Sequence, residues 1–170
     1  IPGINDVSPI KGDDPMFADG VVEYLGQSIF AVAAETIELA RAAAAKAMKT
    51  DDVAGICLRG KPGWGDLGAS LTTVVNTFGG TWWDANDDGS IGAAQVNTGG
   101  FKDAFNFYNQ LLKDAGQPDA ANASFNECLK LMQDSKAAMW YDATVAAGIL
   151  EAADSPIKGK LAYALAPTKE

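Results

Sequence analysis

The chain has 170 residues, 48% of them hydrophobic, which at this length predicts one domain with a substantial core. Its formal net charge of −9 argues against nucleic acid and anionic membranes as partners, because both are bound by clustered lysine and arginine. The sequence has no histidine, which excludes Ser–His and Cys–His catalysis and histidine metal sites.

An irregular arm and one helix are predicted for the first third of the chain. Residues 1–20 are rich in proline, glycine and aspartate and have no periodicity, which is typical of a loop. The stretch Ser28–Lys49 is rich in alanine, and its apolar residues recur at helical spacing. Thr36 is an alternative start, so this stretch forms either one helix or two.

A strand, a loop and a helix are predicted next. Val53–Leu58 is short, apolar and bounded by polar turns, as a buried strand is. Arg59–Gly65 contains three glycines and a proline and is predicted to be a loop. Asp66–Phe78 has an apolar stripe at helical spacing, and Gly79 suits the left-handed position that ends a helix.

The middle of the chain is predicted to hold an extended segment and a long helix. Thr81–Asp84 is expected to be extended, and Asp84–Gly89 is an acidic turn. Gly99–Gly116 has the clearest helical periodicity in the sequence, and its apolar stripe is predicted to be core packing.

The last third of the chain repeats the strand–loop–helix plan. Ser124 and Glu127 match a capping box, which opens a helix that runs to about Gln133. A buried strand at Ala137–Tyr141, a helix capped by Asp142 and a final strand at Lys160–Leu165 follow. Helices with four to six strands between them predict a helix-rich α/β or α+β domain.

Cys57 lies in a predicted strand and Cys128 on the apolar face of a predicted helix, and neither belongs to a CxxC motif. We expect two buried free thiols. A disulfide is the alternative, and it needs Cα atoms roughly 4.4–6.8 Å apart.

Two loops are candidates for a ligand site, because ligands of open α/β sheets bind beyond the carboxyl ends of the strands. These loops combine aromatic faces with charged hydrogen-bonding groups, which is what a polyhydroxylated ligand requires. The candidate residues are Arg59, Lys61, Trp64, Trp140 and Asp142. Purely structural roles are the alternative, in which Trp64 covers the core edge, Arg59 pairs with a local carboxylate and Asp142 is only an N-cap.

A second candidate site is the acidic turn, which fits the start of a calcium loop. Its ligands would be Asp84, Asn86, Asp88 and the backbone carbonyl of Ser90. The twelfth position is Gln95 instead of the usual bidentate glutamate, and a solvated acidic turn is the alternative. Any calcium bound here would be structural.

Several stretches in a fixed order resemble the extracellular solute-binding proteins of ABC importers, in particular the family 1 group that binds sugar alcohols such as sorbitol and mannitol. The stretches are GICLRGKPGWG, TTVVNTFGGTWWD, FKDAFNFYNQLL, SFNECLKLMQDSKAAMWYDATVAAG and KLAYALAP. The resemblance extends from Thr36 to about Pro167. Ile37 stands where the family usually has tryptophan, and Ser135 where it usually has glycine before the strand.

The resemblance implies one lobe of a two-lobed receptor of the periplasmic-binding-protein type II-like fold, which closes around its ligand. Residues 36–170 would be the C-terminal lobe, and residues 1–35 an unmatched N-terminal arm or helix. A full member of the family is considerably longer, so this sequence is expected to be a fragment, an excised lobe or an engineered chain. The implied partners are a sugar or sugar alcohol, the missing N-terminal lobe and the ABC permease of the inner membrane. The expected location is the periplasm or the cell exterior, with a lipid anchor on the full-length protein as one option.

In the family, the loops that correspond to the two candidate loops line the cleft, which supports Arg59, Lys61, Trp64, Trp140 and Asp142 as ligand residues. We therefore predict a binding module that performs no chemistry. An isolated lobe that binds nothing itself and acts as a structural unit is one alternative. A glycosidase that uses Asp66 and Asp142 as its two carboxylates is another, although neither lies in a recognisable catalytic motif.

Overall fold

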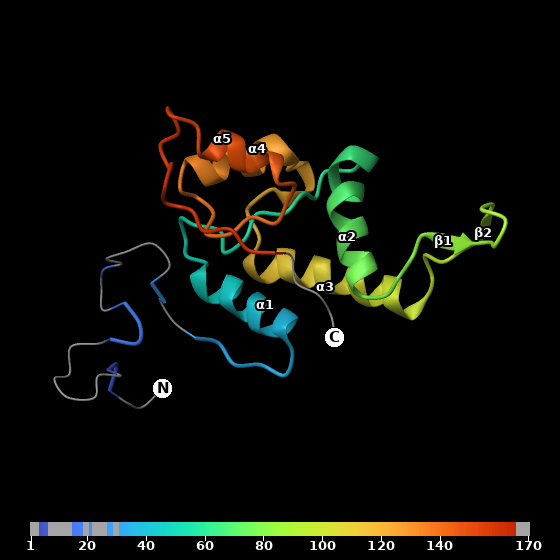
Figure 1. Cartoon of the computed structure of the whole chain (residues 1–170), viewed down its shortest axis with the longest axis horizontal. Helices are drawn as coiled ribbons and strands as arrows, with labels where there is room; N and C mark the ends of the chain where they lie inside the picture. Colours follow the sequence, from blue (N-terminus) through green and yellow to red (C-terminus); the bar gives the residue numbers. More distant parts are fainter. Residues whose placement is uncertain (1–3, 7–14, 19–20, 22–26, 29–30, 166–170) are drawn as a thin grey trace.

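The computed structural model describes residues 4–6, 15–18, 21, 27–28 and 31–165, so most of the predicted arm at residues 1–20 lies outside the described residues. Helices account for most of the regular structure, with one small hairpin (Figure 1). No helix in this described part is long and apolar enough to cross a membrane. The elements are α1 (Ile37–Met48), the π-helical turn η1 (Trp64–Gly68), α2 (Ala69–Thr77), β1 (Trp83–Ala85), β2 (Ile91–Ala94), α3 (Gly99–Ala115), the 3₁₀ turn η2 (Ala120–Asn122), α4 (Phe125–Gln133) and α5 (Val145–Leu150).

The first helix begins at the later of its two predicted starts. Thr36 has extended backbone angles, and its side-chain oxygen accepts a hydrogen bond from the backbone N–H of Leu39 at 3.2 Å, as an N-cap does. Residues 31–36 precede the helix and are not helical. The prediction of one continuous helix over Ser28–Lys49 is therefore wrong, and the alternative start at Thr36 is confirmed.

Three short parallel segments cross the centre of the fold. Isolated bridges join Ala54 to Ala137 and Cys57 to Trp140, so the two predicted buried strands lie side by side. A third bridge joins Ile56 to Gly116, just after α3. These contacts are single bridges and not full ladders, so the four to six strands that we expected are not found in the part of the chain that the structure describes.

The buried side chain of Gln117 extends this pairing. Its Oε1 accepts a hydrogen bond from Leu58 N at 3.2 Å, and its Nε2 donates to Leu58 O at 2.6 Å. One side chain therefore satisfies both backbone groups of Leu58, as a neighbouring strand would. The segment of residues 53–58, which we call the central segment, is thus held on both sides up to Leu58.

Two hydrophobic cores lie on opposite sides of the central segment. Cys57 packs with α4 and α5, whereas its neighbours Ile56 and Leu58 pack with α2 and α3. Figure 1 shows α4 and α5 grouped together at the top of the fold, and α3 running past α1 and the lower end of α2. The architecture is thus helices packed around a minimal parallel core, in agreement with the predicted helix-rich α/β class.

The two helices α2 and α3 meet at a pair of glycines. Gly79 ends α2 with a φ of 71°, which confirms the predicted left-handed position. A side chain at Gly80 would place its Cβ 2.8 Å from Phe101 N, so the chain can approach α3 this closely only without one. The predicted helix start at Asp66 is wrong: α2 begins at Ala69 after η1, and Asp66 itself has non-helical angles.

The apolar stripe of α3 is core packing, as predicted, with one exception. Phe101, Ala104, Tyr108 and Ala115 are buried, and Leu111 and Leu112 pack against the same core. Phe105 is instead 45% exposed.

The hairpin of β1 and β2 projects from the body of the fold (Figure 1). Trp83 pairs with Ala94 and Ala85 with Ile91, and the acidic turn connects the two strands. The sequence predicted the extended segment and the turn, but not β2. The residues of both strands are largely exposed.

The C-terminal third follows the prediction in part. The capping box of Ser124 and Glu127 is present at the start of α4. Thr144, not Asp142, is the N-cap of α5, which ends at Leu150 instead of near Ala152. The predicted final strand at Lys160–Leu165 is wrong: it pairs with no segment of the described chain, and a strand needs a partner for its backbone groups.

Cys57 and Cys128 form a disulfide, with their Cα atoms 5.6 Å apart. Both residues are fully buried. Our expectation of two free thiols is therefore wrong, and the alternative holds. The central segment and the inner face of α4 bring the two residues together across 71 positions of sequence, which local patterns do not reveal.

Candidate functional site

The two predicted ligand loops meet at one edge of the fold. The segments that precede them run parallel, so both loops leave from the same edge. Arg59 Nε donates a hydrogen bond of 2.8 Å to Asp142 Oδ2, and Arg59 Nη2 donates a second one to Asp142 Oδ1. The two side chains are only 11% and 3% exposed. A buried bidentate ion pair therefore joins the loops, and Arg59 has the carboxylate partner that the structural alternative anticipated.

The carboxylate of Asp142 is fully engaged. Besides the two bonds from Arg59, it accepts hydrogen bonds from Trp140 Nε1 at 3.1 Å and from Ala143 N at 2.6 Å. Four donors match the lone-pair capacity of a carboxylate. The hydrogen bond to Asp142 is the main cause of the raised pKa of Arg59, and it outweighs desolvation, which acts in the opposite direction. Asp142 thus holds Arg59 and Trp140 in place.

Phe125 completes the surroundings of Arg59. The guanidinium carbon lies 5.2 Å from the centre of the Phe125 ring, within the range of a cation–π contact. The same ring lies 5.1 Å from that of Trp140. We call Arg59, Phe125, Trp140 and Asp142 the arginine cluster. Phe125 was not among the predicted site residues, and its place directly after the cap Ser124 was the local signal for it.

The backbone around Arg59 is also fixed. Arg59 Nη1 donates to Gly65 O at 2.7 Å, which folds the loop back on its own start. Tyr108 of α3 donates its hydroxyl hydrogen to Arg59 O at 2.7 Å. Burial raises the pKa of the Tyr108 phenol well above its ordinary value, so the hydroxyl stays a donor at neutral pH. Arg59 is therefore in contact with α3 through its carbonyl and with α4 through its guanidinium.

Trp64 presents an open aromatic face on the same loop. It is 67% exposed, and it meets Trp82 edge to face, with the ring centres 5.6 Å apart. Trp82 in turn packs against Phe101 at 4.9 Å and donates from Nε1 to Thr72 Oγ1 at 3.0 Å. This supporting role of Trp82 was not predicted from the sequence. Trp64 is thus braced on one side and free on the other.

Lys61 is the exposed cation of the loop. Its side chain is 53% exposed, and its ammonium lies 3.9 Å from the carboxylate of Asp66. The backbone below it is anchored, because Gly60 N and Lys61 N both donate to Ala123 O at 3.0 Å. The structure therefore brings all five predicted ligand residues to one edge, with Arg59, Trp140 and Asp142 largely enclosed and Lys61 and Trp64 facing outward.

This edge is suited to binding a hydroxyl-rich molecule. An exposed indole offers a surface for aliphatic C–H groups, and Arg59 and Lys61 carry charged N–H donors for hydroxyl oxygens. The hydrogen bonds to Asp142 and Gly65 use three of the five N–H groups of Arg59. As a base or nucleophile, Asp142 would have to give up its pairing with Arg59, so the geometry does not favour the glycosidase alternative.

The predicted calcium ligands lie at the tip of the hairpin and bond to one another. Asp88 Oδ1 accepts hydrogen bonds from Ser90 Oγ at 2.6 Å and from Ser90 N at 2.9 Å, and these two bonds lower the pKa of Asp88. Asn86 Nδ2 donates to Ser90 Oγ at 2.9 Å, and Gln95 Nε2 donates to Asp84 Oδ2 at 2.6 Å. Within the described residues, no three acidic or cysteine side chains gather as a metal site would require. Calcium binding by this turn stays a prediction.

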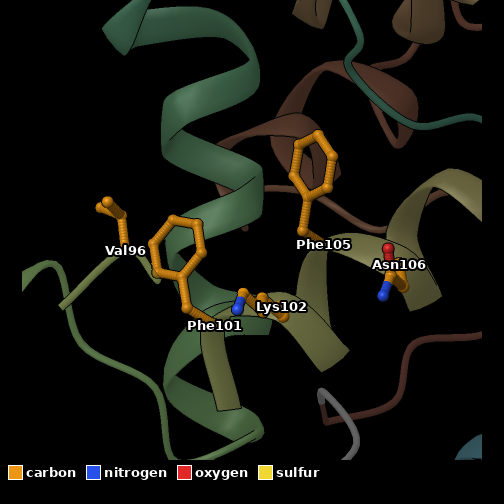
Figure 2. A pocket seen from close by; sticks show the side chains of 5 residues that line it. All are labelled: Val96, Phe101, Lys102, Phe105 and Asn106. Carbon is orange, nitrogen blue, oxygen red and sulfur yellow. The ribbon is translucent and has the colours of Figure 1, made fainter. Parts of the chain in front are cut away.

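A separate pocket of about 240 Å³ lies along the start of α3 (Figure 2). In Figure 2 the rings of Phe101 and Phe105 stand on one side of the helix, with Val96 facing Phe101. Lys102 and Asn106 complete the lining. None of the five predicted ligand residues lines this pocket.

The sequence model of the family described as bacterial extracellular solute-binding protein matches residues 6–170. The chain belongs to this family. The matched range includes residues 6–35, which lie outside the stretch that carried the resemblance in the sequence.

Two known binding proteins are similar to this chain. The chain is 31% identical to the mannitol-binding protein of Pseudomonas aeruginosa, over 98% of this chain and 40% of that protein. It is 38% identical to an ABC transporter solute-binding protein of Agrobacterium vitis S4, whose crystal structure has D-mannitol bound. That likeness has a TM-score of 0.67 and covers 76% of this chain and 30% of the other.

The comparisons confirm the predicted family and fold class, and both relatives are binding proteins, not enzymes. The chain spans 40% of the length of the curated relative. The division into an arm and a C-terminal lobe stays a prediction.

Proposed function

We propose that the chain forms the C-terminal lobe of a sugar-alcohol receptor for an ABC importer. One observation carries the proposal: the exposed face of Trp64 stands at the edge where the buried Arg59–Asp142 pair joins two loops. An open aromatic face beside a rigid, hydrogen-bonding base is the usual form of a carbohydrate-type site. The mannitol-binding relative and the mannitol-bound structure favour a sugar alcohol as the ligand class.

Each residue of the edge has a distinct role in this proposal. Trp64 packs against the carbon chain of the polyol, and Lys61 donates to a hydroxyl group at the rim. Arg59 keeps N–H groups for the ligand beyond the three that bind Asp142 and Gly65. Asp142 and Trp140 orient Arg59, and Trp140 adds a second aromatic edge.

The mechanism is lobe closure without chemistry. A polyol bound at this edge would be enclosed by a second lobe, and the closed form would be presented to the permease in the inner membrane. Such a receptor works in the periplasm or outside the cell. Enclosure and a fixed site geometry contribute more to affinity than contact area does, so this lobe alone should bind more weakly than the complete receptor.

The test is thermal unfolding with millimolar mannitol, sorbitol, maltose or calcium. A ligand that binds only the folded state stabilises it by about 2.7 kcal/mol at a hundred times its dissociation constant. We expect mannitol or sorbitol to raise the midpoint, and Trp64→Ala to abolish that shift. Trp83→Ala is the matched control, because Trp83 is an exposed tryptophan on the hairpin and should leave the shift intact.

The other outcomes separate the alternatives. If neither this chain nor a receptor of the relatives' full length that contains it responds to any polyol, the proposed function is wrong, and an isolated structural unit is the better description. A shift with calcium alone would support the turn at residues 84–90. An equal loss of the polyol shift in Trp64→Ala and Trp83→Ala would remove Trp64 from the site.

A further inference from the structure

We propose that the Cys57–Cys128 disulfide positions the arginine cluster and thereby sets the ligand affinity of the edge where the two loops meet. We call this edge, formed by Arg59, Lys61, Trp64, Trp140 and Asp142, the ligand edge. The inference rests on the proposed function, because it assigns the bond a role in that same site. It goes beyond stability: the bond would hold the two parts of the chain that surround the guanidinium of Arg59 at a fixed separation.

One end of the disulfide lies in the segment that leads into Arg59. Cys57 is two residues before Arg59 and is bridged to Trp140 of the arginine cluster. Cys57 N donates to Met139 O at 2.8 Å, so this end belongs to the parallel core. The position of Cys57 therefore fixes the point from which the arginine leaves the core.

The other end lies one helical turn below Phe125. Cys128 is three residues after Phe125 in α4, and residues at this spacing share a helix face. Cys128 N donates to Ser124 O at 3.2 Å, within the first turn of the helix. Because this turn is a rigid unit with a capping box, holding Cys128 also holds the ring of Phe125 beneath Arg59.

The other attachments between this loop and the start of α4 are non-covalent. Within the described residues they include the two hydrogen bonds from Gly60 N and Lys61 N to Ala123 O, and the cation–π contact between Arg59 and Phe125. Each is individually weak and exchangeable with water. Without the disulfide, α4 would depend on these contacts and on packing of its apolar face. Small shifts of the helix would then move the Phe125 ring away from the guanidinium, and the ligand edge would lose part of its preorganisation.

The experiment compares the oxidised chain with its reduced form and with the double variant Cys57→Ala/Cys128→Ala. Two quantities are measured under conditions where all forms are folded. The first is the dissociation constant for mannitol or sorbitol by calorimetry. The second is the solvent exchange of the Trp140 indole N–H by NMR, assigned with Trp140→Phe, because this hydrogen is bonded to Asp142 inside the cluster.

We expect loss of the bond to raise the dissociation constant about tenfold and to accelerate indole exchange by a similar factor. Ile157→Ala is the control, because Ile157 is buried in the same core as the disulfide and is not part of the arginine cluster. It should lower stability while leaving both quantities unchanged. If the double alanine variant is unfolded, Cys57→Ala/Cys128→Val refills part of the lost volume and is measured in its place.

The inference is overturned if removal of the bond leaves the polyol affinity and the Trp140 exchange at their original values, or if Ile157→Ala changes them equally. Failure of the proposed function has a different signature. In that case the oxidised chain and its full-length parent bind no polyol, while the Trp140 exchange still reports whether the disulfide positions the cluster.

Discussion

The guanidinium of Arg59 and the carboxylate of Asp142, 83 residues apart in the sequence, form a bidentate pair that is almost completely buried. The pair connects the loop after the central segment with the loop after its neighbour. Through Tyr108 and Phe125, the same arginine also contacts a helix from each of the two cores. The ligand edge and the junction of the cores are therefore one structure, so changes at the edge should affect binding and folding together.

Asp142→Asn is expected to lower the free energy of unfolding by about 3 kcal/mol, because removing one partner leaves a buried charge uncompensated. The measurement is urea-induced unfolding at pH 7. The surface pair of Lys130 and Asp134 is the matched control, since its side chains are 74% and 46% exposed. Asp134→Asn should change stability by no more than about 0.5 kcal/mol. Equal effects of the two substitutions would contradict the assignment of Asp142 as a buried partner.

Reduction of the disulfide is expected to lower the free energy of unfolding by about 4 kcal/mol, because a cross-link over 71 positions restricts the unfolded chain strongly. Urea unfolding with and without a phosphine reductant measures the difference. The variant Cys57→Ala/Cys128→Ala should show the same low stability in both conditions. If the reductant also destabilises that variant, its effect on the wild type does not come from this bond.

Tyr108→Phe is expected to cost about 1–2 kcal/mol, because it leaves the buried carbonyl of Arg59 without its hydroxyl donor. Tyr163→Phe provides the comparison, since the hydroxyl of Tyr163 also donates a hydrogen bond, to Glu151, but the residue is 58% exposed. That change should be close to neutral in the same urea experiment. A neutral Tyr108→Phe would show that water replaces the missing donor.

Alkaline pH is expected to destabilise the fold through Tyr108. Burial raises the pKa of its phenol above the ordinary value of 10.0. Below pH 10 the phenol is protonated in both the folded and the unfolded chain, so it contributes no pH dependence. Above pH 10 the unfolded chain releases the proton and the folded chain does not, so stability falls as pH rises.

Urea unfolding between pH 8 and about pH 11 measures this slope, and absorbance near the phenolate band follows the ionisation directly. Tyr108→Phe should flatten the pH dependence. An unchanged slope in that variant would assign the effect to another group, for example Tyr141, whose pKa burial also raises.

Local signals in the sequence predicted some helix boundaries, whereas the helix starts predicted at Asp66 and Asp142 were wrong. Thr36, Gly79 and Ser124 were recognised because caps act within one turn of the residue itself. The same reasoning failed at Lys160–Leu165, because a strand depends on a partner elsewhere in the chain. The thiol state of Cys57 and Cys128 failed for a related reason, since spacing alone does not show which helix face meets the central segment.

The sequence predicted the location of the candidate site more reliably than the contacts that its residues make. The rule that loops at the carboxyl ends of parallel segments converge placed Arg59 and Asp142 together. It did not show that both carboxylate oxygens of Asp142 accept hydrogen bonds from Arg59, Trp140 and Ala143. Phe125 was missed because its role depends on the packing angle of α4, for which the sequence holds no periodic signal.

The close approach of Gly80 and Gly100 has a practical consequence for engineering. A Cβ on Gly100 would lie 3.0 Å from Gly80 N, so the chain leaves and re-enters the body of the fold at nearly one point. The segment between them, residues 81–99, contains the hairpin, and the residues of its tip belong to neither core. That tip can therefore be exchanged for a foreign peptide or a fluorescent reporter without separating the ends that support it. Trp82 must be kept in such a graft, since its ring braces that of Trp64.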